Sequence, residues 1–241
     1  LAVHSTAVAS TSAARDGVIT RRGLPSAPRD AAATTAAVGS MCAALVARAP
    51  KSARRFSATN SPMLVLITGA AGGLGRQLAL HWAREGAVVA LWDVRAAALD
   101  AVCDWLSREN GVPAASLHPR CVDVADARAV SRAAESQLRA LGPVRVLVNN
   151  AAIVHGHRLL AATDADLQRA IEVNVLGHFW TVRAFMPQLA SHGEGGSVVT
   201  ISSLMASVPC AGLADYCASK AAVCQLHECL RCEIRLRAAP P

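Results

Sequence analysis

The sequence predicts an α/β fold, a doubly wound parallel sheet with helices on both faces, formed by one domain over residues 61–241. Short apolar runs of strand length alternate with longer segments that carry apolar residues at helical spacing. A glycine-rich turn follows the first apolar run, and polar residues follow several of the others. At 241 residues the chain is long enough to bury a substantial core in one domain.

The predicted elements alternate regularly along the domain. Strands are expected at residues 63–68, 87–92, 118–122, 144–148 and 197–201, the third having the weakest pattern. Helices are expected at residues 74–85, 96–109, 125–141, 165–189 (as one helix or two) and 214–236. Because a helix follows each strand, the connections are right-handed crossovers and the strands run parallel.

Residues 1–60 differ in composition from the rest of the chain. They contain eight Arg and Lys but only two Asp, a net charge of +6, whereas residues 61–241 carry sixteen basic and fifteen acidic residues, or +1. The basicity therefore lies outside the predicted domain, and nucleic-acid binding is disfavoured. A basic, acid-poor stretch rich in Ala, Ser and Thr is typical of a disordered leader or of a transit peptide for a mitochondrion or plastid.

The eight cysteines do not form a recognisable metal motif. Cys229 and Cys232 make the only C-x-x-C pair, and no second pair completes a zinc site. We expect no metal, and buried free thiols in a reducing compartment.

The segment 68–75, TGAAGGLG, lies between the first predicted strand and the first predicted helix. Glycines at such a turn let the backbone approach a pyrophosphate bound at the helix N-terminus. Asp93 follows Gly75 by 18 residues and ends the next strand, close to the spacing of a carboxylate that binds the adenosine ribose. A carboxylate there repels a 2′-phosphate, which favours NAD; Arg95 and Arg76 would soften that preference, so NADP is the second candidate.

Tyr216 is the only tyrosine of the chain, and Lys220 is one of two lysines. Residues four apart lie on the same face of a helix, so the phenol and the ammonium are expected side by side. A neighbouring positive charge lowers a phenol pKa from its usual value near ~10. Tyr216 is therefore a candidate general base. A tyrosine that merely precedes a lysine is the alternative.

Polar residues also follow the third and fourth predicted strands. Asp123 stands at the end of one, and Asn149 and Asn150 at the end of the other. In an open parallel sheet ligands bind at this edge. A helix cap for Asp123 and a turn for the asparagines are equally good explanations when each is taken alone.

Together with Asn174 and Ser203, these motifs resemble the short-chain dehydrogenase/reductase family, in order and spacing, over residues 63–236. The segments 91–93 (LWD), 177–181 (GHFWT) and 215–220 (DYCASK) are similar to the membrane-associated branch of retinol and 17-beta-hydroxysteroid dehydrogenases. The resemblance implies a Rossmann fold.

The resemblance also implies the roles of four catalytic residues. Tyr216 would exchange a proton with the substrate oxygen, and Ser203, thirteen residues earlier, would hydrogen-bond that oxygen. Lys220 would lower the tyrosine pKa and hold the nicotinamide ribose, and Asn174 would anchor a water that relays protons to solvent.

The cofactor contacts implied by the resemblance extend over the whole sheet edge. Around the pyrophosphate they are Thr68, Gly69, Gly73, Leu74 and Gly75; at the adenosine, Asp93, Asp123 and Val124; near the central sheet, Asn150 and Ala151; and at the nicotinamide ribose, Tyr216 and Lys220.

The implied activity is hydride transfer between NAD(P) and an alcohol or carbonyl on a lipophilic retinoid or steroid, by a homo-oligomer associated with endoplasmic reticulum or lipid-droplet membranes. Family members continue past the helix at 214–236, so we expect two C-terminal strands to be missing and the strand at 197–201 to be an exposed edge. The alternative is a truncated, non-catalytic protein that binds dinucleotide or pairs with other subunits.

Overall fold

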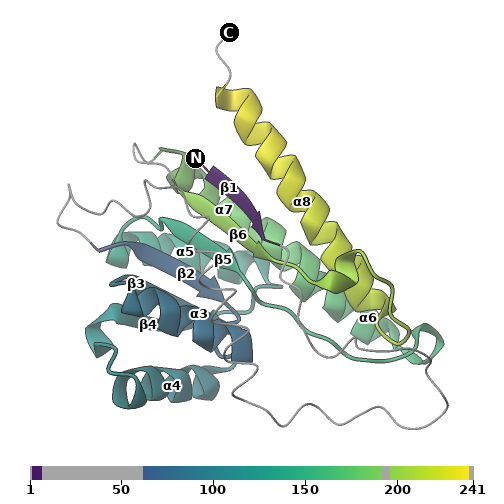
Figure 1. Cartoon of the computed structure of the whole chain (residues 1–241), viewed down its shortest axis with the longest axis horizontal. Coiled ribbons are helices and arrows are strands. Elements are labelled where there is room, and N and C mark those ends of the chain that lie inside the picture. The colour runs from purple at the N-terminus through teal and green to yellow at the C-terminus, as the bar shows by residue number, and fades with distance from the viewer. Residues whose placement is uncertain (1, 7–61, 192–195, 239–241) are drawn as a thin grey trace.

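The computed structural model describes residues 2–6, 62–191 and 196–238, with side chains described over 62–191 and 196–234. Six parallel strands form one sheet in the order β1-β6-β5-β2-β3-β4 (Figure 1). The strands are β1 Ala2–Thr6, β2 Leu64–Thr68, β3 Val88–Asp93, β4 Leu117–Cys121, β5 Val146–Asn149 and β6 Ser197–Ile201.

Helices cover both faces of the sheet (Figure 1). They are α3 Gly73–Arg84, α4 Ala96–Asp104, α5 Ala127–Leu141, α6 Asp164–Ile171, α7 Gly177–Ser191 and α8 Ala214–Ala238. Short helical turns are η1 Trp105–Glu109, η2 Ala114–Ser116, η3 Leu159–Ala161, η4 Glu172–Leu176 and η5 Leu204–Ala206. The segment predicted as one or two helices is thus α6 and α7, joined by η4, a π-helical turn of the kind often found at functional sites.

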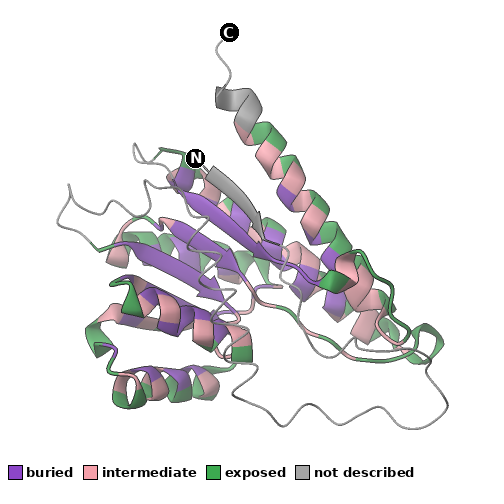
Figure 2. Ribbon diagram, in the orientation of Figure 1, coloured by how far each residue is buried: buried purple, intermediate pink, exposed green. Residues whose placement is uncertain are grey.

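Strands β2, β3, β5 and β6 are almost entirely buried, as Figure 2 shows for the central sheet, whereas the edge strand β4 is partly exposed. Along β2, Val65 and Ile67 pack in the core formed with α3 and α4, whereas Leu64 and Leu66 pack in the core formed with α5 and α7. This alternation follows from the two-residue period of a strand. The predicted doubly wound fold is confirmed. Parallel strands covered by helices on both faces have apolar residues at nearly every position, which is the sequence pattern that predicted this fold.

The edge of the sheet beside β6 differs from our expectation. Strand β1 pairs in parallel with β6, from Ala2 opposite Ser197 to Thr6 opposite Ile201. The expected exposed edge is therefore covered, and the first residues of the predicted leader form a strand. Strand pairing needs only backbone N–H and C=O groups. A five-residue segment can therefore pair with an open sheet edge although its sequence has no alternation of apolar and polar residues that would predict a strand. The rest of the leader lies outside the described residues.

The sheet has a point where the strand order reverses. From β2 the chain adds β3 and β4 on one side, then crosses back to add β5 and β6 on the other. The segments that leave the C-terminal ends of β2 and β5 consequently run in opposite directions. A crevice at this position is where open parallel sheets bind ligands.

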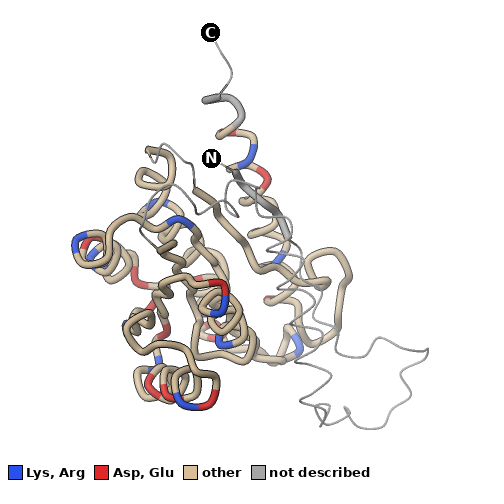
Figure 3. The backbone as a smooth tube through the Cα atoms, turned by 60° about the vertical axis from the view of Figure 1, so that its left-hand side comes forward, with Lys and Arg blue, Asp and Glu red and all other residues tan. Residues whose placement is uncertain are grey.

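Charge and thiols are spread over the surface. In Figure 3 basic and acidic residues are interspersed along the helices.

The prediction of buried thiols is wrong for the described cysteines, since none is fully buried. Cys103, Cys217 and Cys224 are half-buried, and Cys121, Cys210, Cys229 and Cys232 are exposed, all as free thiols. Cys229 and Cys232 are exposed because they lie on faces of α8 that the sheet does not cover.

Candidate functional site

The glycine-rich loop between β2 and α3 is shaped by close backbone approaches. Gly69 has φ +64°, and a Cβ on it would lie 2.7 Å from Cα of Ala151. A Cβ on Gly75 would lie 2.2 Å from the carbonyl oxygen of Gly69. Only glycine fits at these two positions, one for conformation and space and the other for space. The loop therefore stays thin enough for a ligand to reach its backbone.

Asp93 holds the loop from the end of β3. Its Oδ2 accepts a hydrogen bond from the backbone N–H of Ala71 at 3.0 Å. Its Oδ1 accepts from both the backbone N–H and the Nε of Arg95, each at 3.1 Å. The Asp93 side chain is only 5% exposed, whereas that of Arg95 is 58% exposed. The carboxylate is thus buried and held in place, whereas the guanidinium bonded to it is largely exposed to solvent.

Asn150 and Thr68 join the ends of β5 and β2. The Nδ2 group of Asn150 donates to the carbonyl oxygens of Thr68 at 2.9 Å and Gly69 at 3.1 Å. The Oγ1 of Thr68 accepts from the backbone N–H groups of Asn150 at 3.0 Å and Ala151 at 3.1 Å. The side chain of Thr68 therefore holds the C-terminal ends of β2 and β5 together, at the point where the strand order reverses.

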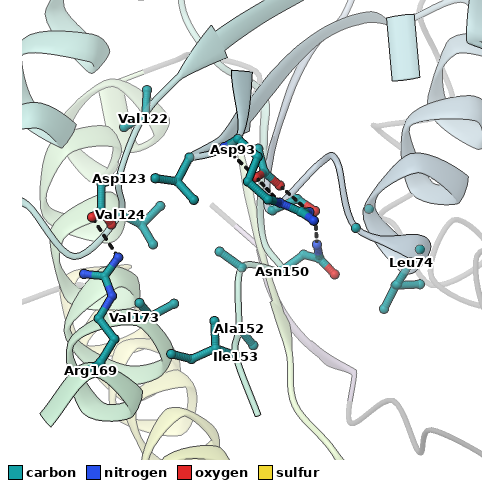
Figure 4. Close-up of a pocket in the computed structure, with 17 residues that line it drawn as sticks. Leu74, Asp93, Val122, Asp123, Val124, Asn150, Ala152, Ile153, Arg169 and Val173 are labelled. Atoms are coloured by element: carbon teal, nitrogen blue, oxygen red, sulfur yellow. Dashed lines mark hydrogen bonds and ion pairs between the residues drawn. The ribbon is translucent and has the colours of Figure 1, made fainter. Parts of the chain in front are cut away.

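A groove of about 520 Å³ runs along this edge (Figure 4). Its walls include nine of the residues predicted to hold a cofactor: Gly69, Gly73, Leu74, Gly75, Asp93, Asp123, Val124, Asn150 and Ala151. The other three predicted residues, Thr68, Tyr216 and Lys220, do not line it. Thr68 is 2% exposed and turned toward β5, which explains its absence from the wall.

Asp123 has a partner that the sequence did not reveal. Its Oδ1 accepts from the backbone N–H of Ala125 at 3.0 Å, and its Oδ2 accepts from Nη2 of Arg169 at 2.8 Å. Arg169 and Val173 both line the groove. Their four-residue spacing in the predicted helical segment is the signal that could have found them.

Asn174 lies in η4 and is completely buried. Its Oδ1 accepts from the backbone N–H of Ile153 at 2.8 Å, and its Nδ2 donates to the Ile153 carbonyl at 2.9 Å and to Oγ of Ser219 at 3.1 Å. The amide thus connects the segment after β5 with helix α8. Ser219 was missed, although it directly precedes Lys220.

Lys220 is 2% exposed, and its Nζ donates to the carbonyl oxygen of Ile201 at 2.9 Å. The ammonium lies 5.6 Å from the ring centroid of Tyr216, over the ring. Burial lowers the pKa of Lys220 to about 8. The two side chains are neighbours, as their helical spacing predicted.

The pKa of Tyr216 is raised, first by burial of the phenol and less by Cys217, while a hydrogen bond with the Ser203 side chain acts in the opposite direction. The prediction that Lys220 lowers this pKa is wrong in this arrangement. The ammonium faces the ring and bonds to Ile201 instead of lying beside the hydroxyl. The Ser203 side chain lies within hydrogen-bonding reach of the Tyr216 phenol, an arrangement that is compatible with both residues acting on one substrate oxygen.

A buried histidine lies behind these residues. His178 is 3% exposed and follows Asn174 by one helical turn. Burial, then the positive charge of Lys220 and the nearby His227, lower the pKa of His178 to about 3. His178 is consequently neutral at physiological pH and leaves Lys220 as the buried cation.

Residues 63–238 match the family model described as short chain dehydrogenase. The chain belongs to the short-chain dehydrogenase family. Its similarity to the retinol dehydrogenase branch, predicted from the sequence, is confirmed by relatives with that name.

Two relatives illustrate this similarity. Epidermal retinol dehydrogenase 2 of Homo sapiens is 40% identical over 157 residues, which cover 65% of this chain and 50% of that protein. Retinol dehydrogenase 10-A of Danio rerio is 34% identical over 189 residues, which cover 70% of this chain and 56% of that protein. The chain spans about half the length of these curated relatives.

Solved structures share the fold. A short-chain dehydrogenase/reductase from Burkholderia phymatum, crystallised in complex with NAD, matches with a TM-score of 0.68 and 31% sequence identity, over 73% of this chain and 62% of that one. A short-chain dehydrogenase from Streptomyces avermitilis matches with a TM-score of 0.65 and 33% identity, over 73% and 62% of the two chains.

Proposed function

We propose that the protein is an oxidoreductase that binds NAD(H) in the groove and interconverts an alcohol and a carbonyl on a lipophilic substrate of the retinoid or steroid class. The observation that carries this proposal is the hydrogen bond between the Ser203 side chain and the Tyr216 phenol, with the buried Lys220 ammonium over the tyrosine ring. These three residues come from the end of β6 and the start of α8.

The groove fits a dinucleotide. The thin loop at Gly69 and Gly75 leaves backbone N–H groups at the N-terminus of α3 open to a pyrophosphate. When bound, the nicotinamide would accept or supply the hydride. Gly73, Leu74, Asn150 and Ala151 would hold its phosphates and the central part of the cofactor.

The protein itself moves the proton. Tyr216 would exchange a proton with the substrate oxygen, and Ser203, which is hydrogen-bonded to the phenol, would orient that oxygen. Lys220 would hold the nicotinamide ribose, and Asn174 would keep Ile153 and helix α8 in register beside it. A proton relay through a water on Asn174 remains part of the proposal.

NAD is the preferred cofactor in this proposal. The Asp93 carboxylate lies in the groove wall, where it would bind the adenosine ribose hydroxyls and repel a 2′-phosphate. Arg95 already donates to Asp93 and is largely exposed, so its guanidinium could turn toward a phosphate. NADP is therefore the secondary cofactor.

Exposed apolar side chains favour a lipophilic substrate. Val154, Leu159 and Leu160 follow β5 with 52%, 58% and 101% exposure, and Leu204 and Val208 follow β6 with 42% and 43%. Both segments leave the C-terminal edge of the sheet, the edge that carries Ser203. Apolar side chains gathered at a ligand-binding edge suit a substrate with a large hydrocarbon part.

A second candidate is dinucleotide binding without turnover, in a protein that also pairs with other subunits. It is favoured by two observations: the pKa of Tyr216 is raised, and Lys220 bonds to Ile201. The catalytic and the non-catalytic functions predict the same cofactor affinity and differ only in turnover.

The deciding experiment uses the full 241-residue chain. NADH and NADPH are titrated by nicotinamide fluorescence, and NAD-dependent oxidation of all-trans-retinol is then followed. The wild type should bind NADH more tightly than NADPH and turn over, because Asp93 disfavours the 2′-phosphate. Tyr216→Phe should lower kcat by about 10³-fold and leave NADH affinity almost unchanged, because it removes only the general acid–base.

Ser203→Ala should also reduce kcat, whereas Ser207→Ala, which changes an exposed hydroxyl on the same segment, should not. Equal activity of Tyr216→Phe and wild type would disprove the catalytic assignment. NADH binding without any turnover by the wild type would support the second candidate.

The cellular site and assembly complete the proposal. We infer association with endoplasmic reticulum or lipid-droplet membranes, with a mitochondrion or plastid as the alternative indicated by residues 1–60, and a homo-oligomeric state. Over the described part of the chain, no helix combines the length and apolar character needed to cross a membrane.

A further inference from the structure

We propose that Arg169 is a positioning residue for the base-recognition end of the groove, where it orients the Asp123 carboxylate so that the site selects a 6-amino purine over a 6-oxo purine. This inference rests on the proposed dinucleotide function. Figure 4 shows Asp123 and Arg169 together on one side of the groove, opposite Leu74.

The Asp123 carboxylate is held at both oxygens. Oδ1 accepts from the Ala125 N–H at 3.0 Å, and Oδ2 accepts from Nη2 of Arg169 at 2.8 Å. The second contact is a charge-assisted hydrogen bond across elements, since Asp123 follows β4 and Arg169 lies on α6. These two bonds come from different directions and hold the carboxylate in one orientation. Its remaining lone pairs stay available to a ligand.

The guanidinium is itself held in place. Its Nη1 lies 3.7 Å from Oε2 of Glu172, so Arg169 lies between two carboxylates. Helix α6 begins with a capping box in which Thr163 and Asp166 exchange hydrogen bonds, which fixes its first turn. Arg169 therefore presents its Nη2 to Asp123 from a rigid support.

The chemistry at Asp123 distinguishes purines. An ionised carboxylate only accepts hydrogen bonds, so it attracts the exocyclic amino group of adenine and repels the keto oxygen of hypoxanthine. Both Asp123 and Arg169 are partly exposed, with side-chain exposures of 34% and 39%, so each is accessible to a bound base. If Arg169 is lost, the carboxylate keeps its charge but can rotate about its Ala125 contact, and discrimination should fall.

The test compares two reduced dinucleotides, NADH and its hypoxanthine analogue, by fluorescence titration of the full chain. The wild type should prefer NADH by about tenfold, the value of one good hydrogen bond. Arg169→Met should lower this preference to about twofold, mainly by weakening NADH. Arg169→Lys should restore part of it, and Asp123→Asn should also lower it. The double variant should show no further loss, because both changes act on one group.

Arg132→Met is the matched control, since Arg132 is an exposed arginine on α5 outside the groove. It should leave the preference unchanged. A tenfold preference retained by Arg169→Met, with NADH still bound, would overturn this inference and leave the proposed function intact. Failure of the wild type to bind NADH would instead overturn the proposed function, and the inference with it. None of these measurements requires turnover.

Discussion

The glycine-loop half of the site and the catalytic half are held by different kinds of contact. In the first, glycines let backbone segments approach one another closely and bond directly: Ala70 N–H donates to the Trp92 carbonyl at 3.0 Å, and Gly72 N–H to the Gly69 carbonyl at 3.1 Å. In the second, buried side chains make them. Asn174, Lys220 and the residues around them bond from one element to another through amide, ammonium and hydroxyl groups.

This second network continues behind the catalytic residues. Oγ of Ser202 donates to the Lys220 carbonyl at 3.2 Å, and Oγ1 of Thr181 donates to Oδ1 of Asn149 at 2.8 Å. Nδ1 of His227 lies 2.9 Å from Oγ1 of Thr200. The difference implies two kinds of sensitivity: the glycine-loop half should fail when volume is added, and the catalytic half when a buried polar partner is removed.

The largest effect is expected from Gly75→Ala. Its Cβ would meet the Gly69 carbonyl oxygen at 2.2 Å and the Ala70 Cα at 2.8 Å, both backbone atoms that cannot turn away. We expect the free energy of unfolding, measured with urea, to fall by more than about 3 kcal/mol. Gly73→Ala is the matched control, because a Cβ there meets nothing within 4 Å, and its cost should stay below about 0.5 kcal/mol. Similar losses in both variants would contradict the steric explanation.

A smaller effect is expected from Asn174→Ala. The change removes a buried amide and leaves the Ile153 N–H and carbonyl without their Asn174 partner, while the Ser219 hydroxyl keeps its bond to the Tyr216 carbonyl. The free energy of unfolding should fall by about 2–3 kcal/mol, and any turnover should fall with it. Gln168→Ala, which removes an exposed contact between Gln168 on α6 and Glu172 on η4, should cost less than about 0.5 kcal/mol. If Asn174→Ala lost as little stability as Gln168→Ala, the stability of the catalytic half would not depend on its buried amide.

The smallest effect is a pH dependence that arises in the catalytic half. Because the pKa of His178 is lowered from 6.5 to about 3 in the folded protein, the unfolded chain binds a proton first as pH falls. Stability is therefore fully present above about pH 6.5 and is lost below it. Between pH 7.5 and 5.5 the wild type should lose roughly 1 kcal/mol more of its free energy of unfolding than His178→Leu. Urea unfolding at the two pH values measures the difference, and parallel losses in the two proteins would contradict it.

The sequence predicted the glycine-loop half almost completely. Its residues are close in the chain, and their types carry the reason: glycine where a Cβ would clash, and a carboxylate at the next strand end. Arg169 was missed because its partner Asp123 is 46 residues away and an arginine on a helix is usually solvated. Spacing also paired Tyr216 with Lys220 correctly, but it could not show that the ammonium turns to Ile201.

The sequence by itself determined the order of strands and helices, the family and the residue types at the sheet edge, because period, glycine placement and helical spacing are local properties of the chain. Tertiary structure alone decided which oxygen each buried donor bonds, the direction of the Tyr216 pKa shift, and the strand that covers β6. Those outcomes depend on burial and on contacts between distant segments. Lys220 illustrates the division: its place beside Tyr216 follows from four residues of helix, and its pKa of about 8 follows from being enclosed.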